Sequence, residues 1–130
     1  MRTAMAIKVV DASALAALLF GEPEADIIAV RLEGAQLVAP ALLGFELANV
    51  CLIKSRRHPE QRDALLAAFG MRGRLQVAAA TVDHGGVLEL ANATGLTAYD
   101  ACYLWLARQL DAELVTLDRQ LANAEKASQT

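Results

Sequence analysis

The sequence predicts an α/β fold in which helices flank a central parallel sheet. Short apolar runs recur along the chain, and a segment with the apolar spacing of a helix follows each of them. Strands that alternate with helices need crossover connections, which produce a parallel sheet. The 130 residues are 55% hydrophobic and 21% charged. This composition is sufficient for one domain, residues 1–130, whose core needs no disulfides.

The first third of the chain contains two expected strands and two helices. Residues 7–12 form the first strand, and the helix that follows it ends near Gly21. Pro23 fits the first turn of the second helix, and Gly34 ends that helix. Residues 37–39 form the second strand.

The middle of the chain is expected to be mostly helical. A long helix covers about 41–57, and Pro59 opens the next one. Residues 75–78 form the third strand, and residues 81–93 form a helix despite two adjacent glycines.

The last third repeats the helix and strand alternation. Thr97 begins a strongly apolar helix, and residues 113–117 form the fourth strand. A final helix extends to about Lys126. Because residues 127–130 contain no apolar run, we expect a flexible tail there.

Four carboxylates lie at the end of an expected strand or within an expected helix, in apolar surroundings: Asp11, Glu46, Asp100 and Asp118. The functional crevice of a parallel sheet lies beyond the carboxyl ends of its strands, where two of these acids fall and the other two can reach from helices. Carboxylates in apolar surroundings need a partner, and hard divalent cations prefer their oxygens. The sequence therefore predicts a divalent-metal site.

Helix capping is the alternative explanation for three of the acids. Asp118 can cap the final helix, and Asp11 the first, with Ser13 as an equally good cap. Asp100 lies three residues after Thr97, which is close to a capping box. Taken one at a time, capping and metal binding remain open for these residues.

Glu46 lies in the middle of a helix, where it cannot be a cap. Its alternative is a glutamate at the rim of a buried stripe. Asn49, one turn later on the same face, could orient Glu46 or a bound water. His58 and His84 lack the spacing of ligands or of a catalytic pair, so we expect surface positions for both.

Composition excludes several classes of protein. Cys51 and Cys102 lack C-x-x-C spacing and are expected to be reduced core residues. No apolar run has the length of a membrane span, so we expect a cytoplasmic protein without a membrane contact. The net charge of −3 is unusual for a nucleic-acid-binding protein, but cations bound at an acidic site would neutralise part of it.

Four segments together resemble the motifs of the PIN-domain nucleases, and more narrowly those of the VapC toxins: residues 9–15, 45–49, 96–103 and 114–121. They occur in the family's order over nearly the whole chain. The resemblance implies a PIN-like three-layer α/β/α sandwich with a parallel sheet of four to five strands. It also implies an endoribonuclease that depends on Mg²⁺ or Mn²⁺ and is the toxin of a toxin–antitoxin pair.

The resemblance also suggests residue roles. The family's acidic quartet matches Asp11, Glu46, Asp100 and Asp118, which are expected to be both catalytic and metal-binding. The supporting groups that it suggests are Ser13, Thr116 and Asn49. Magnesium keeps several waters, and one of them can attack a phosphodiester once its pKa is lowered.

Partners follow from the same resemblance and from charge. We expect an RNA substrate, a small VapB-like antitoxin lying over the early helices, and a homodimer or a higher hetero-oligomer. Lys54, Arg56 and Arg57, with further arginines downstream, could grip RNA phosphates. A solvated helix end is the alternative, since basic residues there favour the helix dipole. The family commonly has a short fifth strand after the last helix, for which this chain has no apolar run.

Two other functions are considered. A non-catalytic PIN-fold module that binds RNA or protein would keep the fold, although the acidic quartet is complete. A metal-dependent phosphatase of the haloacid dehalogenase type also begins with a strand ending in aspartate. That class needs a second aspartate two residues later, and Ser13 stands there instead.

Overall fold

Four parallel strands form the sheet in the computed structural model, which describes residues 5–128. The strands are β1 (Ile7–Val10), β2 (Gln36–Pro40), β3 (Ala78–Ala80) and β4 (Glu113–Val115). Their order is β3-β2-β1-β4, so the chain steps outward from β1 to β3 and then returns to the other side of β1. Val10 pairs with Val115, and the segments that follow β1 and β4 therefore begin side by side.

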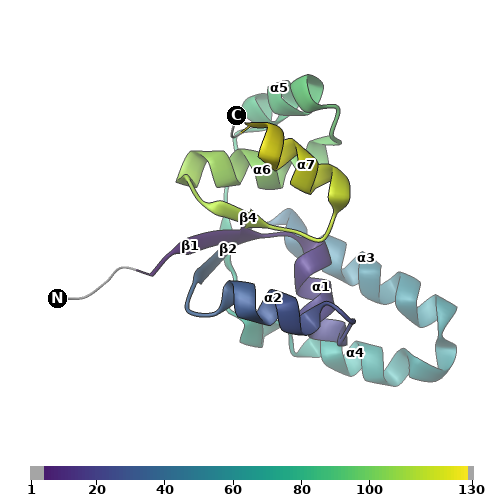
Figure 1. Cartoon of the computed structure of the whole chain (residues 1–130). Helices are drawn as coiled ribbons and strands as arrows, with labels where there is room; N and C mark the ends of the chain where they lie inside the picture. Colours follow the sequence, from purple (N-terminus) through teal and green to yellow (C-terminus); the bar gives the residue numbers. More distant parts are fainter. Residues whose placement is uncertain (1–4, 129–130) are drawn as a thin grey trace.

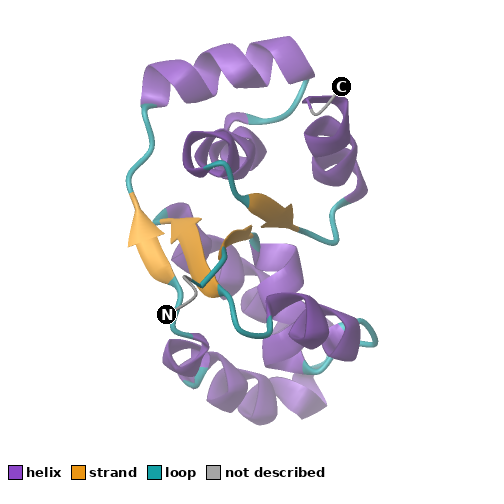
Figure 2. Ribbon diagram, turned by 60° about the vertical axis from the view of Figure 1, so that its left-hand side comes forward, coloured by secondary structure: helices purple, strands orange, loops and turns teal. Residues whose placement is uncertain are grey.

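Helices cover both faces of the sheet. They are α1 (Ala12–Phe20), α2 (Ala25–Leu32), α3 (Leu42–Arg57), α4 (Arg62–Gly70), α5 (His84–Thr94), α6 (Ala98–Leu110) and α7 (Arg119–Ser128), with short 3-10 turns η1 (Pro59–Gln61) and η2 (Arg72–Leu75). Figure 1 shows α1 to α4 on one side of the sheet and α5 to α7 on the other, and Figure 2 shows the same layers from a second direction. The predicted three-layer α/β/α sandwich is confirmed.

The core lies on both faces of β1. Val9 and Val10 are both fully buried, and neighbouring strand residues point to opposite faces, so both faces of this strand are covered. Helix α6 packs across β1, β2 and β4 on one face, and the fully buried Leu15 of α1 belongs to the other. Cys51 is buried and Cys102 is partly buried, and neither forms a disulfide.

The third strand differs most from its prediction. Residues 72–75 form the 3-10 turn η2, and Gln76 has a left-handed backbone with φ of 53°, which an extended strand cannot contain. The strand therefore begins only at Ala78. Helix α5 likewise begins at His84 and not at 81, because the side chain of Asp83 accepts a hydrogen bond from the Gly86 amide and caps the helix there.

The last strand and the last helix also end at residues other than those predicted. Strand β4 is shorter than predicted and ends at Val115, so the residues that follow it belong to the connection to α7. Helix α7 continues to Ser128, which places residues 127 and 128 of the expected tail in a helix, while residues 129 and 130 lie outside the described residues. The single-domain organisation stays a prediction. No helix between residues 5 and 128 is long and apolar enough to cross a membrane.

Candidate functional site

Asp11 follows the last residue of β1 and is 5% exposed. Its Oδ1 accepts a hydrogen bond from the Ala14 amide at 3.1 Å, so Asp11 is the N-cap of α1. Ser13 Oγ donates to the same oxygen at 2.7 Å, and Thr116 Oγ1 donates to Oδ2 at 2.5 Å. These three donors compensate for the burial of the carboxylate and hold it in one position.

The segment after β4 is tied to the segment after β1 by two hydroxyls. Thr116 Oγ1 also accepts a hydrogen bond from the Asp118 amide at 2.9 Å, and Ser13 Oγ accepts one from the Leu117 amide at 2.9 Å. The exposed Asp118 caps α7, because its Oδ1 accepts from a backbone amide in the first turn of that helix at 2.8 Å. The capping interpretation is therefore correct for both Asp11 and Asp118, and capping leaves both of them beside the same network.

Glu46 and Asp100 come from two helices. Glu46 lies in the second turn of α3, and its Oε1 accepts a hydrogen bond from the Tyr103 hydroxyl at 2.5 Å. Thr97 caps α6 by accepting from the Asp100 amide at 3.1 Å, which places Asp100 in the first turn. Tyr103 was not among the expected site residues. Its spacing of three residues from Asp100, which puts both on one helix face, was the available signal.

Burial and mutual repulsion raise the pKa of three of these acids. Burial is the largest cause of the raised pKa values of Asp11, Glu46 and Asp100. The charge of Asp118 further raises the pKa values of Asp11 and Asp100. The charges of Asp11 and Asp100 in turn raise the pKa of Glu46. The hydrogen bond from Tyr103 acts in the opposite direction on Glu46. The four acids therefore form one electrostatic cluster, although they come from four separate segments.

The donor chemistry of this cluster matches a divalent cation. Carboxylate oxygens are the ligands that Mg²⁺ and Mn²⁺ prefer, and a bound cation would offset the repulsion among the acids. Across residues 5–128, no group of three or more carboxylate, imidazole or thiol side chains is close enough to form a metal site as it stands. The acids thus fit a divalent cation in ligand type and charge, in an arrangement looser than a formed site.

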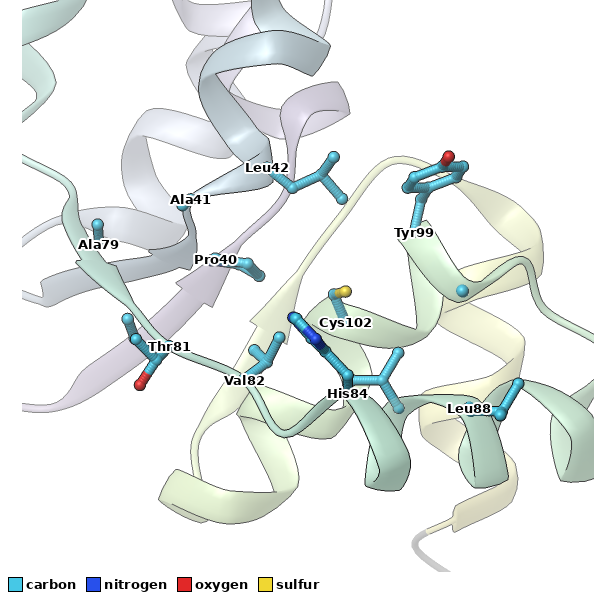
Figure 3. Close-up of a pocket in the computed structure, with 13 residues that line it drawn as sticks. Pro40, Ala41, Leu42, Ala79, Thr81, Val82, His84, Leu88, Tyr99 and Cys102 are labelled. Carbon is cyan, nitrogen blue, oxygen red and sulfur yellow. The ribbon is translucent and has the colours of Figure 1, made fainter.

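Two neighbouring hollows share Leu42 and Tyr99, and the smaller of them is lined by one of the acids. The smaller, of about 330 Å³, is lined by Glu46 and Asn49 together with apolar residues that include Phe45 and Tyr99. The larger, of about 680 Å³, lies where β2 and β3 end against α5 and α6. Figure 3 shows Tyr99 at one rim of this larger hollow, across from Thr81. Neither hollow was predicted, because residues from several elements line each of them.

The predicted basic group lies at the far end of α3 from the acids. Lys54 is eight residues after Glu46, which corresponds to about 12 Å along the helix at 1.5 Å per residue. Its amino group forms an ion pair with Glu22 at 2.7 Å. Arg56 and Arg57 are exposed in the last turn of the helix, where they favour its dipole.

The other ionisable residues near the motifs occupy surface positions. Both histidines, His58 and His84, are exposed, as expected. Asp83 caps α5, and Glu113 forms ion pairs with basic side chains of β1 and α2. Asp111 is the C-cap of α6, with a left-handed backbone at φ of 48°. Capping and ion pairing therefore explain the positions of Asp83, Asp111 and Glu113 without a functional role.

Comparison with known proteins places these motifs in a family. A family model described as the PIN domain matches residues 8–127. The chain belongs to the PIN-domain family. This PIN domain is 34% identical over 119 residues to Ribonuclease VapC3 of Pyrobaculum aerophilum, which covers 88% of the chain and 91% of that relative. The resemblance to PIN domains and to VapC, stated from the four motifs, is confirmed.

A solved structure supports the fold of the PIN domain independently. The crystal structure of PAE2754 from Pyrobaculum aerophilum matches with a TM-score of 0.76 and 26% sequence identity. The match covers 93% of this chain and 86% of the other.

Proposed function

We propose that this protein is an endoribonuclease that cleaves RNA phosphodiester bonds with Mg²⁺ or Mn²⁺ and acts as the toxin of a toxin–antitoxin pair. The observation that carries the proposal is that hydrogen bonds join the segments that bear the four acids. Thr116 links the Asp11 carboxylate to the Asp118 amide, and Tyr103, one turn after Asp100 in α6, donates to Glu46. Capping accounts for individual aspartates, but it does not account for like charges gathered from four segments. The ribonuclease name of the VapC3 relative supports the same reading.

In this proposal the four acids hold the cation. When bound, it would lower the pKa of a water ligand and withdraw charge from the phosphate. The chain itself positions the ligands. Ser13 and Thr116 hold the Asp11 carboxylate through bonds of 2.7 and 2.5 Å, and the Tyr103 hydroxyl orients Glu46. Because these donors are already in place, little reorganisation is needed at the buried acid.

The proposed substrate contacts come from polar side chains outside the four acids. Asn49 lines the smaller hollow with Glu46, where its amide can bind a water or a polar group of the substrate. Arg56 and Arg57 are exposed and can contact RNA phosphates. Lys54 is the weaker candidate, because its ion pair with Glu22 would have to break first.

The expected partners belong to the same proposal. A small VapB-like antitoxin would cover the early helices, where Ile27 and Val30 of α2 are 64% and 71% exposed. We further propose a homodimer or a higher hetero-oligomer in the cytoplasm. The phosphatase alternative is disfavoured, since Ser13 is engaged with Asp11 and no acid stands in its place.

The test is cleavage of a structured RNA pool by the purified protein, without antitoxin, in Mg²⁺ or Mn²⁺ and in EDTA. We expect metal-dependent cleavage that Asp100→Asn reduces by at least about a hundredfold. Asp63→Asn is the matched control, because the Asp63 side chain is fully exposed on α4 and stands outside the cluster. Equal cleavage in EDTA, or an Asp100→Asn variant as active as Asp63→Asn, would contradict the proposal. If neither the wild-type protein nor the Asp100→Asn variant binds Mn²⁺ although both are folded, the binding-module alternative is favoured.

A further inference from the structure

Two exposed aromatic rings stand next to two of the acids. Phe45 directly precedes Glu46 in α3, and Tyr99 directly precedes Asp100 in α6. Their exposed fractions are 81% and 64%, whereas every other aromatic side chain of the chain is buried or partly buried. Both rings line the smaller hollow, of about 330 Å³.

The fold does not use these two rings. Neither Phe45 nor Tyr99 belongs to the buried core or to the partly buried residues packed against it. A single exposed apolar residue is ordinary at a protein surface. Here, however, two large rings from different helices line one hollow beside the acidic cluster. This placement indicates a binding site.

The ligand class follows from the lining of the hollow. The hollow holds no basic side chain: Ala12, Leu42 and Val50 complete the set formed by the two rings, Glu46 and Asn49. A phosphate would be repelled by the acids, whereas an uncharged planar base would find two ring faces to stack on. The Asn49 amide can both donate to and accept from the edge of a base.

We propose that Phe45 and Tyr99 stack against unpaired bases of the RNA beside the cleaved phosphodiester bond, and so determine which nucleotides flank it. This inference rests on the proposed ribonuclease function. Because Glu46 lines the same hollow as the two rings, a base held between them would lie beside an acid of the cluster. Tyr99 also lines the larger hollow and stands at its rim, which gives a second base a place to enter (Figure 3).

Single-stranded RNA is the form that this arrangement would select. Unpaired bases can be splayed out and stacked on aromatic side chains, whereas bases in a duplex are already stacked on each other. The proposal therefore predicts a preference for loops and single strands over duplex RNA of the same sequence. It also predicts that ring shape, and not merely apolar surface, is what the two positions need.

The test measures binding of a short unstructured RNA that carries the fluorescent base 2-aminopurine. The buffer contains Ca²⁺ in place of Mg²⁺ or Mn²⁺, so that a cation can neutralise the acids, and the RNA is checked on a gel to be uncleaved. Phe45→Leu and Tyr99→Leu keep an apolar side chain but remove the ring. We expect each to weaken binding by about five- to a hundredfold and to lose the change in base fluorescence that accompanies stacking. Phe45→Tyr and Tyr99→Phe should bind within about twofold of wild type. Leu110→Ala, at the 39% exposed last position of α6, controls for loss of apolar surface.

Each outcome separates this inference from the proposed function. If wild type cleaves RNA in Mg²⁺ or Mn²⁺ but the leucine variants bind and respond like wild type, stacking is wrong and the nuclease proposal stands. If wild type neither binds nor cleaves RNA, both fall. If the leucine variants keep their RNA affinity but change the molar mass measured by light scattering, the rings belong to a protein contact surface and the inference is overturned.

Discussion

Replacing Thr116 with valine removes one hydroxyl that joins the two sides of the acidic cluster. Thr116 is 7% exposed, donates to Asp11 Oδ2 and accepts from the Asp118 amide at 2.9 Å. Valine has nearly the same shape, so the change removes these two hydrogen bonds, and a 3.3 Å contact with Ser13 Oγ, without creating a cavity. Because the protein is only marginally stable, the loss should be measurable as a lower free energy of unfolding.

The magnitude follows from the two bonds. A hydrogen bond to a charged group contributes about 1.5–3 kcal/mol, and one between neutral groups contributes about 0.5–1.5 kcal/mol. We therefore expect Thr116→Val to lower the free energy of unfolding by about 2–4.5 kcal/mol at pH 7. Among the influences that lower the pKa of Asp11, the bond from Thr116 is the largest, so the variant should raise that pKa further.

The sign of the pH dependence can be derived from this shift. An aspartate whose pKa is raised on folding binds protons more readily in the folded state, so stability increases as pH falls toward the ordinary value of about 3.9. The deficit of the valine variant should therefore be largest at neutral pH. It should shrink as pH is lowered and Asp11 becomes protonated.

The assay is urea unfolding in EDTA, extrapolated linearly to water, at pH 7 and pH 5. Thr116→Ser is the control, because it keeps the hydroxyl and should lose only about 1 kcal/mol for one buried methyl group. A valine variant within about 0.5 kcal/mol of wild type would refute the reasoning. A serine variant as unstable as the valine variant would refute it equally, since the hydroxyl would then not be the stabilising group.

Three further outcomes are expected. Glu113 pairs with Arg31 at 2.7 Å, and this bond is the largest cause of the lowered pKa of Glu113. The stability that the pair contributes is therefore present at neutral pH and is lost as pH falls. Because the Glu113 side chain is 46% exposed, Glu113→Gln should cost no more than about 1 kcal/mol in urea unfolding at pH 7, with a smaller difference at pH 4. A methyl group at Gly86 would lie 2.5 Å from Trp105 Nε1, so Gly86→Ala should destabilise by about 1–3 kcal/mol and alter the tryptophan fluorescence, whereas Gly85→Ala, whose nearest atom would be 3.7 Å away, should do neither. Addition of Mn²⁺ at about ten times its Kd should stabilise the protein by about 1.4 kcal/mol in thermal unfolding, and EDTA should reverse this, while an unchanged midpoint would argue against the metal site.

Local patterns were sufficient to place most helices and the acids. Gly21 and Gly34 end two predicted helices, and both have the positive φ that glycine tolerates best. Thr97 begins a helix at the predicted residue. The ends of a helix depend on the backbone preferences of residues within one turn, so the local sequence determines them. The third strand was misplaced because Gln76 adopts a left-handed backbone that its residue type does not predict.

The sequence by itself determined the α/β class and the family, and it singled out the four candidate acids, because apolar periodicity and motif spacing are local properties of the chain. The contacts that build the site were decided by tertiary structure alone. Thr116 reaches Asp11 across 105 residues, and Tyr103 reaches Glu46 across 57. The first contact depends on the strand order β3-β2-β1-β4 and its register, which bring the end of β4 beside the end of β1. The second depends on the packing of α3 and α6, which both contact β2. Exposure of Phe45 was hidden for the same reason, since only the packed elements show which rings the core leaves out.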